Sequence, residues 1–86
     1  MNKVIIYTSS YCPYCKRAKG LLDSKGVDYT EINLTDSPDE RFELIKKHNW
    51  RTVPMILIND KLIGGFDELA GLERSKELDK ILSNPN

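Results

Sequence analysis

Apolar residues along the chain switch between short continuous runs and helical spacing. Residues 3–8 form a β-branched run without polar alternation, which is typical of a central strand covered on both faces. Residues 13–25 have apolar positions at helical spacing, and Gly26 is expected to end this helix. Residues 28–33 predict a second strand, which should run parallel to the first because a helical crossover joins them.

A second helix is predicted to begin after Ser37. Ser37 suits the N-cap, Pro38 suits the first helical position and Glu40 the third, so together they predict a capping box. Phe42 and Leu44 follow with the spacing of one apolar face. This helix should therefore pack one side against the sheet.

The C-terminal half predicts a hairpin and then a last helical region. Apolar runs at 55–58 and 61–64 flank Asn59-Asp60, a pair that favours a tight turn between antiparallel strands. The helical pattern that follows is expected to break near Gly71. The order βαβαββα predicts an α/β fold in which helices flank a small mixed four-stranded sheet. Spacing alone leaves two-layer and three-layer packing open.

Length and charge exclude several classes of partner. With 86 residues, the chain is expected to form a single domain spanning 1–86. Its 13 basic and 13 acidic residues cancel, so neither nucleic acid nor a membrane surface is an expected partner. The first apolar run is too short for a secretory signal, and we therefore expect a cytoplasmic protein.

The two cysteines of the chain, Cys12 and Cys15, stand two residues apart between the first strand and the first helix. Unpaired N–H groups at a helix N-terminus favour a thiolate, and Pro13 suits the first helical position. Cys15 follows one turn later on the same side. This arrangement predicts thiol–disulfide chemistry, in which Cys12 attacks and Cys15 resolves.

Two other roles for the cysteine pair stay open at this point. The pair could be half of a zinc site, although His48 is the single histidine and a second cysteine pair is missing. It could also be a structural disulfide, although so short a loop would stabilise the fold little through chain entropy. A reducing cytosol favours the redox role over both.

Three motifs in register make the chain resemble the glutaredoxins over almost its whole length. They are Cys12-Pro13-Tyr14-Cys15, Thr52-Val53-Pro54 and Gly64-Gly65-Phe66-Asp67. The resemblance implies a thioredoxin-like fold and a dithiol glutaredoxin that reduces protein disulfides and glutathione mixed disulfides. It also implies glutathione as reductant, no metal, a monomeric state, and disulfide-containing or glutathionylated proteins as partners.

The same resemblance implies a glutathione site beside the cysteines. Tyr14 would line the thiol site. The loop of Thr52, Val53 and Pro54 would lie next to it, with Pro54 in the cis form and the backbone of Val53 paired with the cysteine part of glutathione. Such a turn can offer backbone groups to an extended peptide.

The resemblance assigns the two ends of glutathione to other segments. Gly65, Phe66 and Asp67 would receive the γ-glutamyl end, with Asp67 facing its amino group and backbone N–H groups at a helix start binding its carboxylate. Arg41 would face the glycine carboxylate.

The chain departs from the family at one position, and two other functions remain alternatives. Many relatives have a lysine just before the active-site turn, where this chain has Ser9-Ser10. One alternative is a thioredoxin-like redoxin that a flavoenzyme reduces, although thioredoxins usually have Gly-Pro between the cysteines. The other is a glutathione-ligated [2Fe–2S] carrier that binds iron through Cys12, although cluster-binding relatives generally have a smaller residue than Pro13.

Overall fold

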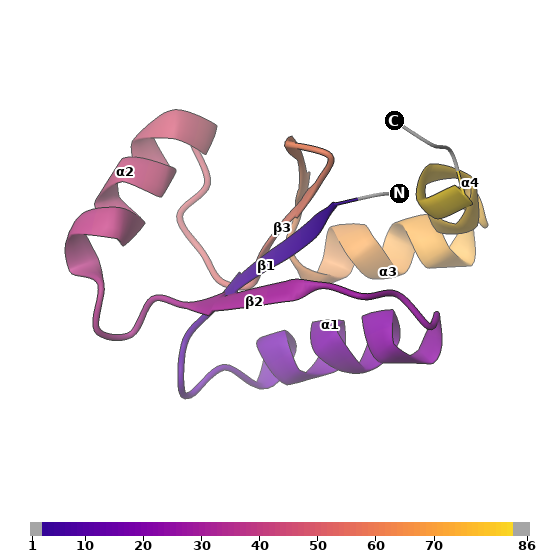
Figure 1. The fold of residues 1–86 in the computed structure, drawn as a ribbon, viewed down its shortest axis with the longest axis horizontal. Coiled ribbons are helices and arrows are strands. Elements are labelled where there is room, and N and C mark those ends of the chain that lie inside the picture. Colours follow the sequence, from indigo (N-terminus) through magenta and orange to yellow (C-terminus); the bar gives the residue numbers. More distant parts are fainter. Residues whose placement is uncertain (1–2, 84–86) are drawn as a thin grey trace.

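A computed structural model describes residues 3–83, which form strands and helices around one sheet (Figure 1). In chain order the elements are β1 (Val4–Thr8), α1 (Pro13–Ser24), β2 (Thr30–Asn33), α2 (Pro38–His48), β3 (Met55–Ile58), β4 (Lys61–Gly64), α3 (Phe66–Arg74) and α4 (Glu77–Ser83). None of the helices in this part of the chain is long and apolar enough to cross a lipid bilayer.

The sheet has four strands in the order β2-β1-β3-β4. β1 pairs in parallel with β2 and antiparallel with β3, and β4 pairs antiparallel with β3. Because β1 is an inner strand with helices on both faces of the sheet, its side chains are almost all buried. This explains its apolar run without alternation, and the predicted mixed sheet is confirmed.

The hairpin between β3 and β4 turns through Asn59 and Asp60, as predicted. Both residues have positive φ, 54° and 67°, which is the backbone of a type I′ turn. Asn59 also anchors the turn to the start of β1, because its N–H donates to the Lys3 carbonyl at 2.8 Å. In return, its Oδ1 accepts from the Lys3 N–H at 2.9 Å.

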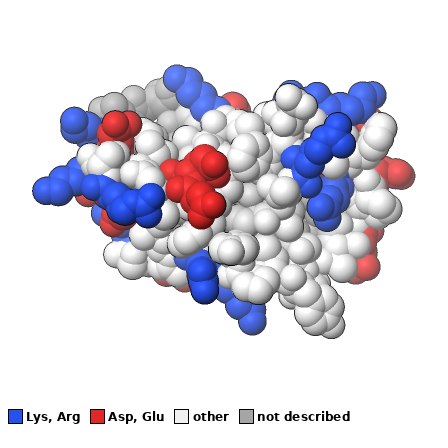
Figure 2. Space-filling model, turned by 180° about the vertical axis from the view of Figure 1, so that it is seen from behind, with Lys and Arg blue, Asp and Glu red and all other residues white. Residues whose placement is uncertain are grey.

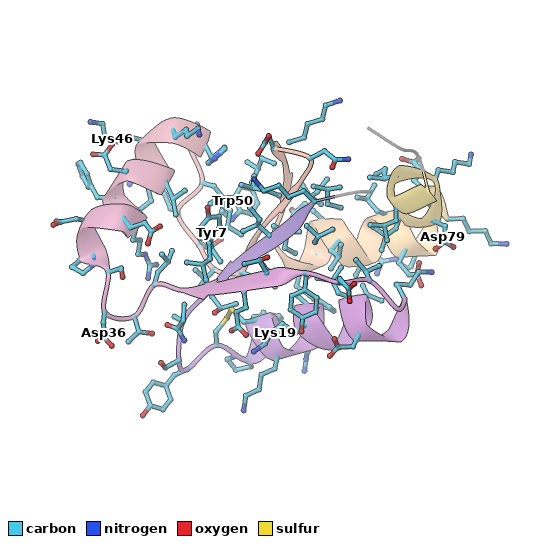
Figure 3. The ribbon with its side chains drawn as sticks, in the orientation of Figure 1. Tyr7, Lys19, Asp36, Lys46, Trp50 and Asp79 are labelled. Carbon is cyan, nitrogen blue, oxygen red and sulfur yellow. A yellow bond between two sulfur atoms is a disulfide. The ribbon has the colours of Figure 1, made fainter. Side chains whose placement is uncertain are left out.

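The helices lie in separate layers on the two faces of the sheet, so the fold has three layers. Figure 1 shows α1 below β2 and α2 at the upper left, and α3 packs against α1 on the face opposite α2. The core on the α1 side is formed by Val4, Ile6, Ala18, Leu22, Ile56, Ile58, Leu69 and Leu78. On the α2 side the buried residues are Tyr7, Leu34, Met55 and Leu57, with Leu44 of α2 and Trp50 packed against them (Figure 3).

An ion cluster ties the end of α1 to the two last helices. Lys25 Nζ lies 2.9 Å from Glu73 Oε1 and 2.6 Å from Asp79 Oδ1. The hydrogen bonds to Asp79 and then to Glu73 raise the pKa of Lys25 above its ordinary value. The adjacent Gly26 has a φ of 68°, which fits the predicted end of α1 at this glycine.

The predicted capping box at the start of α2 is wrong. Ser37 occupies the N-cap position and Pro38 follows it, but the Ser37 side chain makes no capping hydrogen bond. The Ser37 N–H donates instead to the Leu34 carbonyl at 3.0 Å, so the Glu40 side chain has no unpaired N-cap donor to reach.

The predicted break in the last helical region also lies elsewhere. Gly71 stays inside α3, and the helix ends at Arg74. Lys76 then adopts a φ of 66°, which redirects the chain into a separate helix. The observed order is therefore βαβαββαα, and the redirected helix buries Leu78 in the core.

Candidate active site

The two cysteines lie at the N-terminus of α1 and are joined by a disulfide (Figure 3). Cys12 is the N-cap, Pro13 begins the helix, and the Cys15 N–H donates to Cys12 Sγ at 3.1 Å. The first turn of α1 contains no acidic residue. When the pair is reduced, this N–H and the positive end of the helix therefore favour a thiolate at Cys12.

Both cysteines are buried, Cys15 more completely than Cys12. Cys12 is 8% exposed and Cys15 is 2% exposed, so an external disulfide meets Cys12 first. The Cα atoms are 5.1 Å apart, which is a separation that a disulfide spans. The geometry suits a first attack by Cys12 on an external disulfide and a second attack by Cys15 from within the protein.

A cavity of about 440 Å³ opens next to Cys12. Its walls come from the start of α1, the loop before β3 and the start of α3, and are formed by Tyr14, Trp50, Thr52, Val53, Pro54, Gly65, Phe66, Asp67 and Glu68. Cys12 Sγ lies 3.6 Å from the carbonyl oxygen of Val53, so the sulfur stands at the edge of this cavity. The Val53–Pro54 peptide bond is cis, as the resemblance implied.

The glycine pair before α3 lets the helix start lie close to the loop before β3. A Cβ on Gly65 would stand 3.3 Å from the Pro54 carbonyl oxygen and 3.4 Å from a ring carbon of Trp50. A Cβ on Gly64 would stand 2.7 Å from Cγ of Glu68. The Glu68 side chain folds back over Gly64, and its Oε1 accepts from the Gly65 N–H at 2.9 Å.

Aromatic and basic side chains border the cavity at α1. Tyr14 is 54% exposed, and its ring centroid lies 6.2 Å from that of Phe66, which also lines the cavity. The guanidinium of Arg17 lies 5.4 Å from the Tyr14 ring centroid, within cation–π range. An extended peptide in the cavity would thus meet Tyr14 and Phe66 on one side and the loop before β3 on another.

A polar group beneath the site joins β1 to β2 and α1. The buried Thr8 hydroxyl donates to Glu31 Oε2 at 2.7 Å, and Lys19 Nζ lies 3.1 Å from the same oxygen. The Thr8 hydrogen bond, followed by the contact with Lys19, lowers the pKa of the Glu31 carboxyl. These contacts hold the end of β1 that leads into the cysteine loop.

The structure brings together most of the predicted site residues. Those that line the cavity are Tyr14, Thr52, Val53, Pro54, Gly65, Phe66 and Asp67. Arg41 lies instead at a neighbouring smaller hollow, which shares Trp50, Thr52 and Val53 with the cavity. Within residues 3–83, no group of three His, Cys, Asp or Glu side chains is placed to hold a metal ion.

Two residues of the cavity wall were not predicted as site residues. Trp50 lies between α2 and the loop before β3, and its indole Nε1 is buried without a hydrogen-bond partner in the described structure. Glu68 stands three residues after the N-cap Gly65, which is the spacing of a capping box. That spacing could have predicted the hydrogen bond from the Gly65 N–H to the Glu68 carboxylate at the helix start.

Comparison with known proteins agrees with this geometry. The glutaredoxin family model matches residues 4–63. The chain belongs to the glutaredoxin family. It is 49% identical to a glutaredoxin of Pseudomonas aeruginosa over 83 residues, which are 96% of this chain and 99% of that protein. It is 45% identical to glutaredoxin 3 of Escherichia coli over 82 residues, 95% of this chain and 99% of that one.

Solved structures of glutaredoxins have the same fold. A buckwheat glutaredoxin–glutathione complex superposes with a TM-score of 0.89 at 33% identity, covering 95% of this chain and 77% of that one. A Brucella melitensis glutaredoxin superposes with a TM-score of 0.82 at 42% identity, covering 93% and 87%. The thioredoxin-like fold is therefore confirmed, and the Cys12–Cys15 pair makes this a dithiol glutaredoxin, a thiol–disulfide oxidoreductase.

Proposed function

We propose that this glutaredoxin uses glutathione as its reductant and acts on glutathione mixed disulfides and on protein disulfides. The observation behind the proposal is the cavity at the edge of Cys12, whose walls offer the groups that a γ-linked tripeptide needs. Asp67 supplies a carboxylate for an amino group, the start of α3 supplies backbone N–H groups for a carboxylate, and the loop of Thr52, Val53 and Pro54 supplies an extended backbone.

With a glutathionylated protein, the Cys12 thiolate attacks the glutathione sulfur. The bond between the two substrate sulfurs breaks, the protein thiolate leaves and takes a proton from water, and Cys12 is bound to glutathione. A second glutathione thiolate then attacks the glutathione sulfur of this adduct. Oxidised glutathione leaves, and the Cys12 thiolate is restored. Cys15 takes no part in this cycle.

With a protein disulfide, Cys12 attacks one client sulfur and the other client sulfur leaves as a thiolate. The Cys15 thiolate then attacks Cys12 Sγ, which releases the second client thiol and forms the Cys12–Cys15 disulfide. Two glutathiones reduce that disulfide. The short distance between the cysteines and the burial of Cys15 support its role as resolving thiol.

The wider assignment is part of the same proposal. Residues 1–86 act as one glutaredoxin domain, a monomer in the cytoplasm, with glutathione and with disulfide-containing or glutathionylated proteins as partners. Arg41 lies next to the cavity wall at Thr52 and Val53, from which its guanidinium could reach the glycine carboxylate of glutathione.

The test is turnover of a glutathionylated substrate with glutathione as reductant. Cys12→Ser should abolish it, and Cys15→Ser should retain it. Asp67→Asn should raise KM for the glutathionyl substrate about fivefold, since an exposed charge pair contributes about 1 kcal/mol. If the parent turns over poorly with glutathione but efficiently with a flavoenzyme reductase, the proposal is wrong and the thioredoxin-like alternative replaces it.

A further inference from the structure

A second hollow, of about 270 Å³, borders Cys12 and is separate from the cavity described above. Its walls are Ser10, Tyr11, Cys12, Pro13 and Lys16, none of which lines the larger cavity. Cys12 lines this hollow directly, while its sulfur touches the Val53 carbonyl at the edge of the larger cavity. Cys12 thus lies between two depressions.

The reaction requires room for a second group at Cys12. In thiol–disulfide exchange the sulfur under attack is still bonded to the leaving sulfur, so the site must accommodate both substrate groups near Cys12. If glutathione occupies the larger cavity, as the proposed function has it, the polypeptide that bears the other sulfur must lie elsewhere. Of the three hollows described in residues 3–83, this is the one that Cys12 itself lines.

The side chains of the hollow are suited to a polypeptide. Tyr11 is 97% exposed and contributes nothing to the core, so its ring is free to cover an apolar side chain. Lys16 is exposed and is the one charged side chain of the wall. The hollow therefore offers an aromatic surface and a positive charge within one turn of Cys12.

The Ser10 part of the wall is held in place by hydrogen bonds with Thr35, in the segment after β2. The Ser10 N–H donates to Thr35 Oγ1 at 2.8 Å, and the Thr35 hydroxyl donates to Ser10 Oγ at 3.0 Å. Thr35 is fixed in turn, because its N–H donates to Asn33 Oδ1 at 2.9 Å. A surface that is ordered before binding loses less entropy when a partner docks.

We propose that this hollow docks the client polypeptide, and that it prefers a segment with an acidic residue close to the reacting cysteine. The acidic residue pairs with Lys16, and a neighbouring apolar side chain packs on the Tyr11 ring. On the face of the molecule in Figure 2, basic and acidic residues are interspersed. Because the net charge of the chain is zero, we expect the selectivity to come from the local charge at the hollow and not from a long-range field.

The test measures formation of the mixed disulfide without glutathione. In the Cys15→Ser background, Cys12 attacks the peptide sulfur of a peptide whose cysteine is activated as a pyridyl disulfide, and the pyridinethione released is followed by absorbance. Two peptides of equal length are compared, one with acidic and one with basic residues beside an apolar one. Dipyridyl disulfide, which has no polypeptide, gives the intrinsic reactivity of Cys12, and every rate is divided by it.

We expect the acidic peptide to react about fivefold faster than the basic one at low salt, and the ratio to fall as salt is added. Lys16→Glu should invert the ratio, and Tyr11→Ala should slow both peptides about threefold without changing dipyridyl disulfide. Matched controls are Lys61→Glu, at the distant hairpin, and Phe42→Ala, a 60% exposed aromatic residue on α2. Both should behave as the parent.

The proposal is overturned if Lys16→Glu and Lys61→Glu change the ratio of acidic-peptide to basic-peptide rates equally. It is also overturned if Tyr11→Ala slows the reaction with dipyridyl disulfide as much as it slows the reactions with the peptides. Because this assay contains no glutathione, it is independent of the proposed function. A protein that shows peptide selectivity but does not turn over with glutathione would disprove the proposed function and leave the docking surface intact.

Discussion

Replacement of Gly64 by alanine is expected to destabilise the protein by about 2–4 kcal/mol. Gly64 has a φ of 123°, and an L residue held in such a region costs about 1–3 kcal/mol. The new Cβ would also lie 2.7 Å from Cγ of Glu68, so that side chain must move away. Its hydrogen bond to the Gly65 N–H contributes about a further 1 kcal/mol.

Urea unfolding of the reduced protein, followed by the fluorescence of the single tryptophan, Trp50, measures this loss. The matched control is Gly20→Ala in α1, where no atom lies within 4 Å of the added Cβ. That variant should gain about 0.5–1 kcal/mol, because alanine favours a helix over glycine. In a Glu68→Ala background, Gly64→Ala should cost about 1 kcal/mol less, since the clash with Cγ and the lost hydrogen bond no longer apply.

A Gly64→Ala variant whose free energy of unfolding stays within about 0.5 kcal/mol of the parent would refute the backbone argument. Equal losses with and without the Glu68 side chain would refute the steric part of it. The unfolding slope should not change, because neither substitution alters how much surface is exposed on unfolding.

Other substitutions test further parts of the structure. Lys76→Gly should stabilise the protein by about 1 kcal/mol in urea unfolding, because glycine tolerates the φ of 66° there; a loss would contradict this reasoning. Glu31→Gln should lower the free energy of unfolding at neutral pH. The Thr8 hydrogen bond lowers the folded pKa of Glu31 below its ordinary value of 4.5. The stability difference between the parent and Glu31→Gln should therefore be constant above pH 4.5 and vanish as the pH falls through the folded pKa. A difference that stays constant in acid would contradict this. Gly65→Ala should raise KM for glutathionyl substrates, because its Cβ would press on the Pro54 carbonyl oxygen at 3.3 Å and shift the cavity wall. An unchanged KM would argue against a tight cavity wall there.

Much of the architecture followed from local pattern. The unalternating run of β1 predicted an inner strand, Asn59-Asp60 predicted the hairpin turn, and Gly26 marked the end of α1. These features depend on the backbone preferences of a few neighbouring residues, which is why a single sequence predicts them.

The two mispredicted features have different causes, one a competing local turn and the other tertiary packing. Ser37 has the residue type and spacing of a capping box, but its N–H is already paired with Leu34 in the preceding turn. Gly71 is a helix breaker by intrinsic preference, yet it lies in α3 between Leu69 and Leu72, which pack into the core. Tertiary packing outweighed local preference there.

For the site, the motifs predicted most of the cavity wall but could not place every member. Arg41 lies next to the cavity wall instead of on it, because the path of residues 49–54 decides which side chains of α2 face the site. Trp50 could equally have been a surface or a packing residue until this path was known. The contact between Cys12 Sγ and the Val53 carbonyl joins residues 41 positions apart, so local pattern contains no sign of it.

Mass spectrometry of the Cys15→Ser variant after incubation with oxidised glutathione tests the central claim most directly. The account predicts one stable glutathione adduct, located on Cys12, that free glutathione removes rapidly and that Asp67→Asn forms more slowly. If Cys12 forms no such adduct while it still reacts with dipyridyl disulfide, glutathione is not the partner of this active site and the proposed function is wrong.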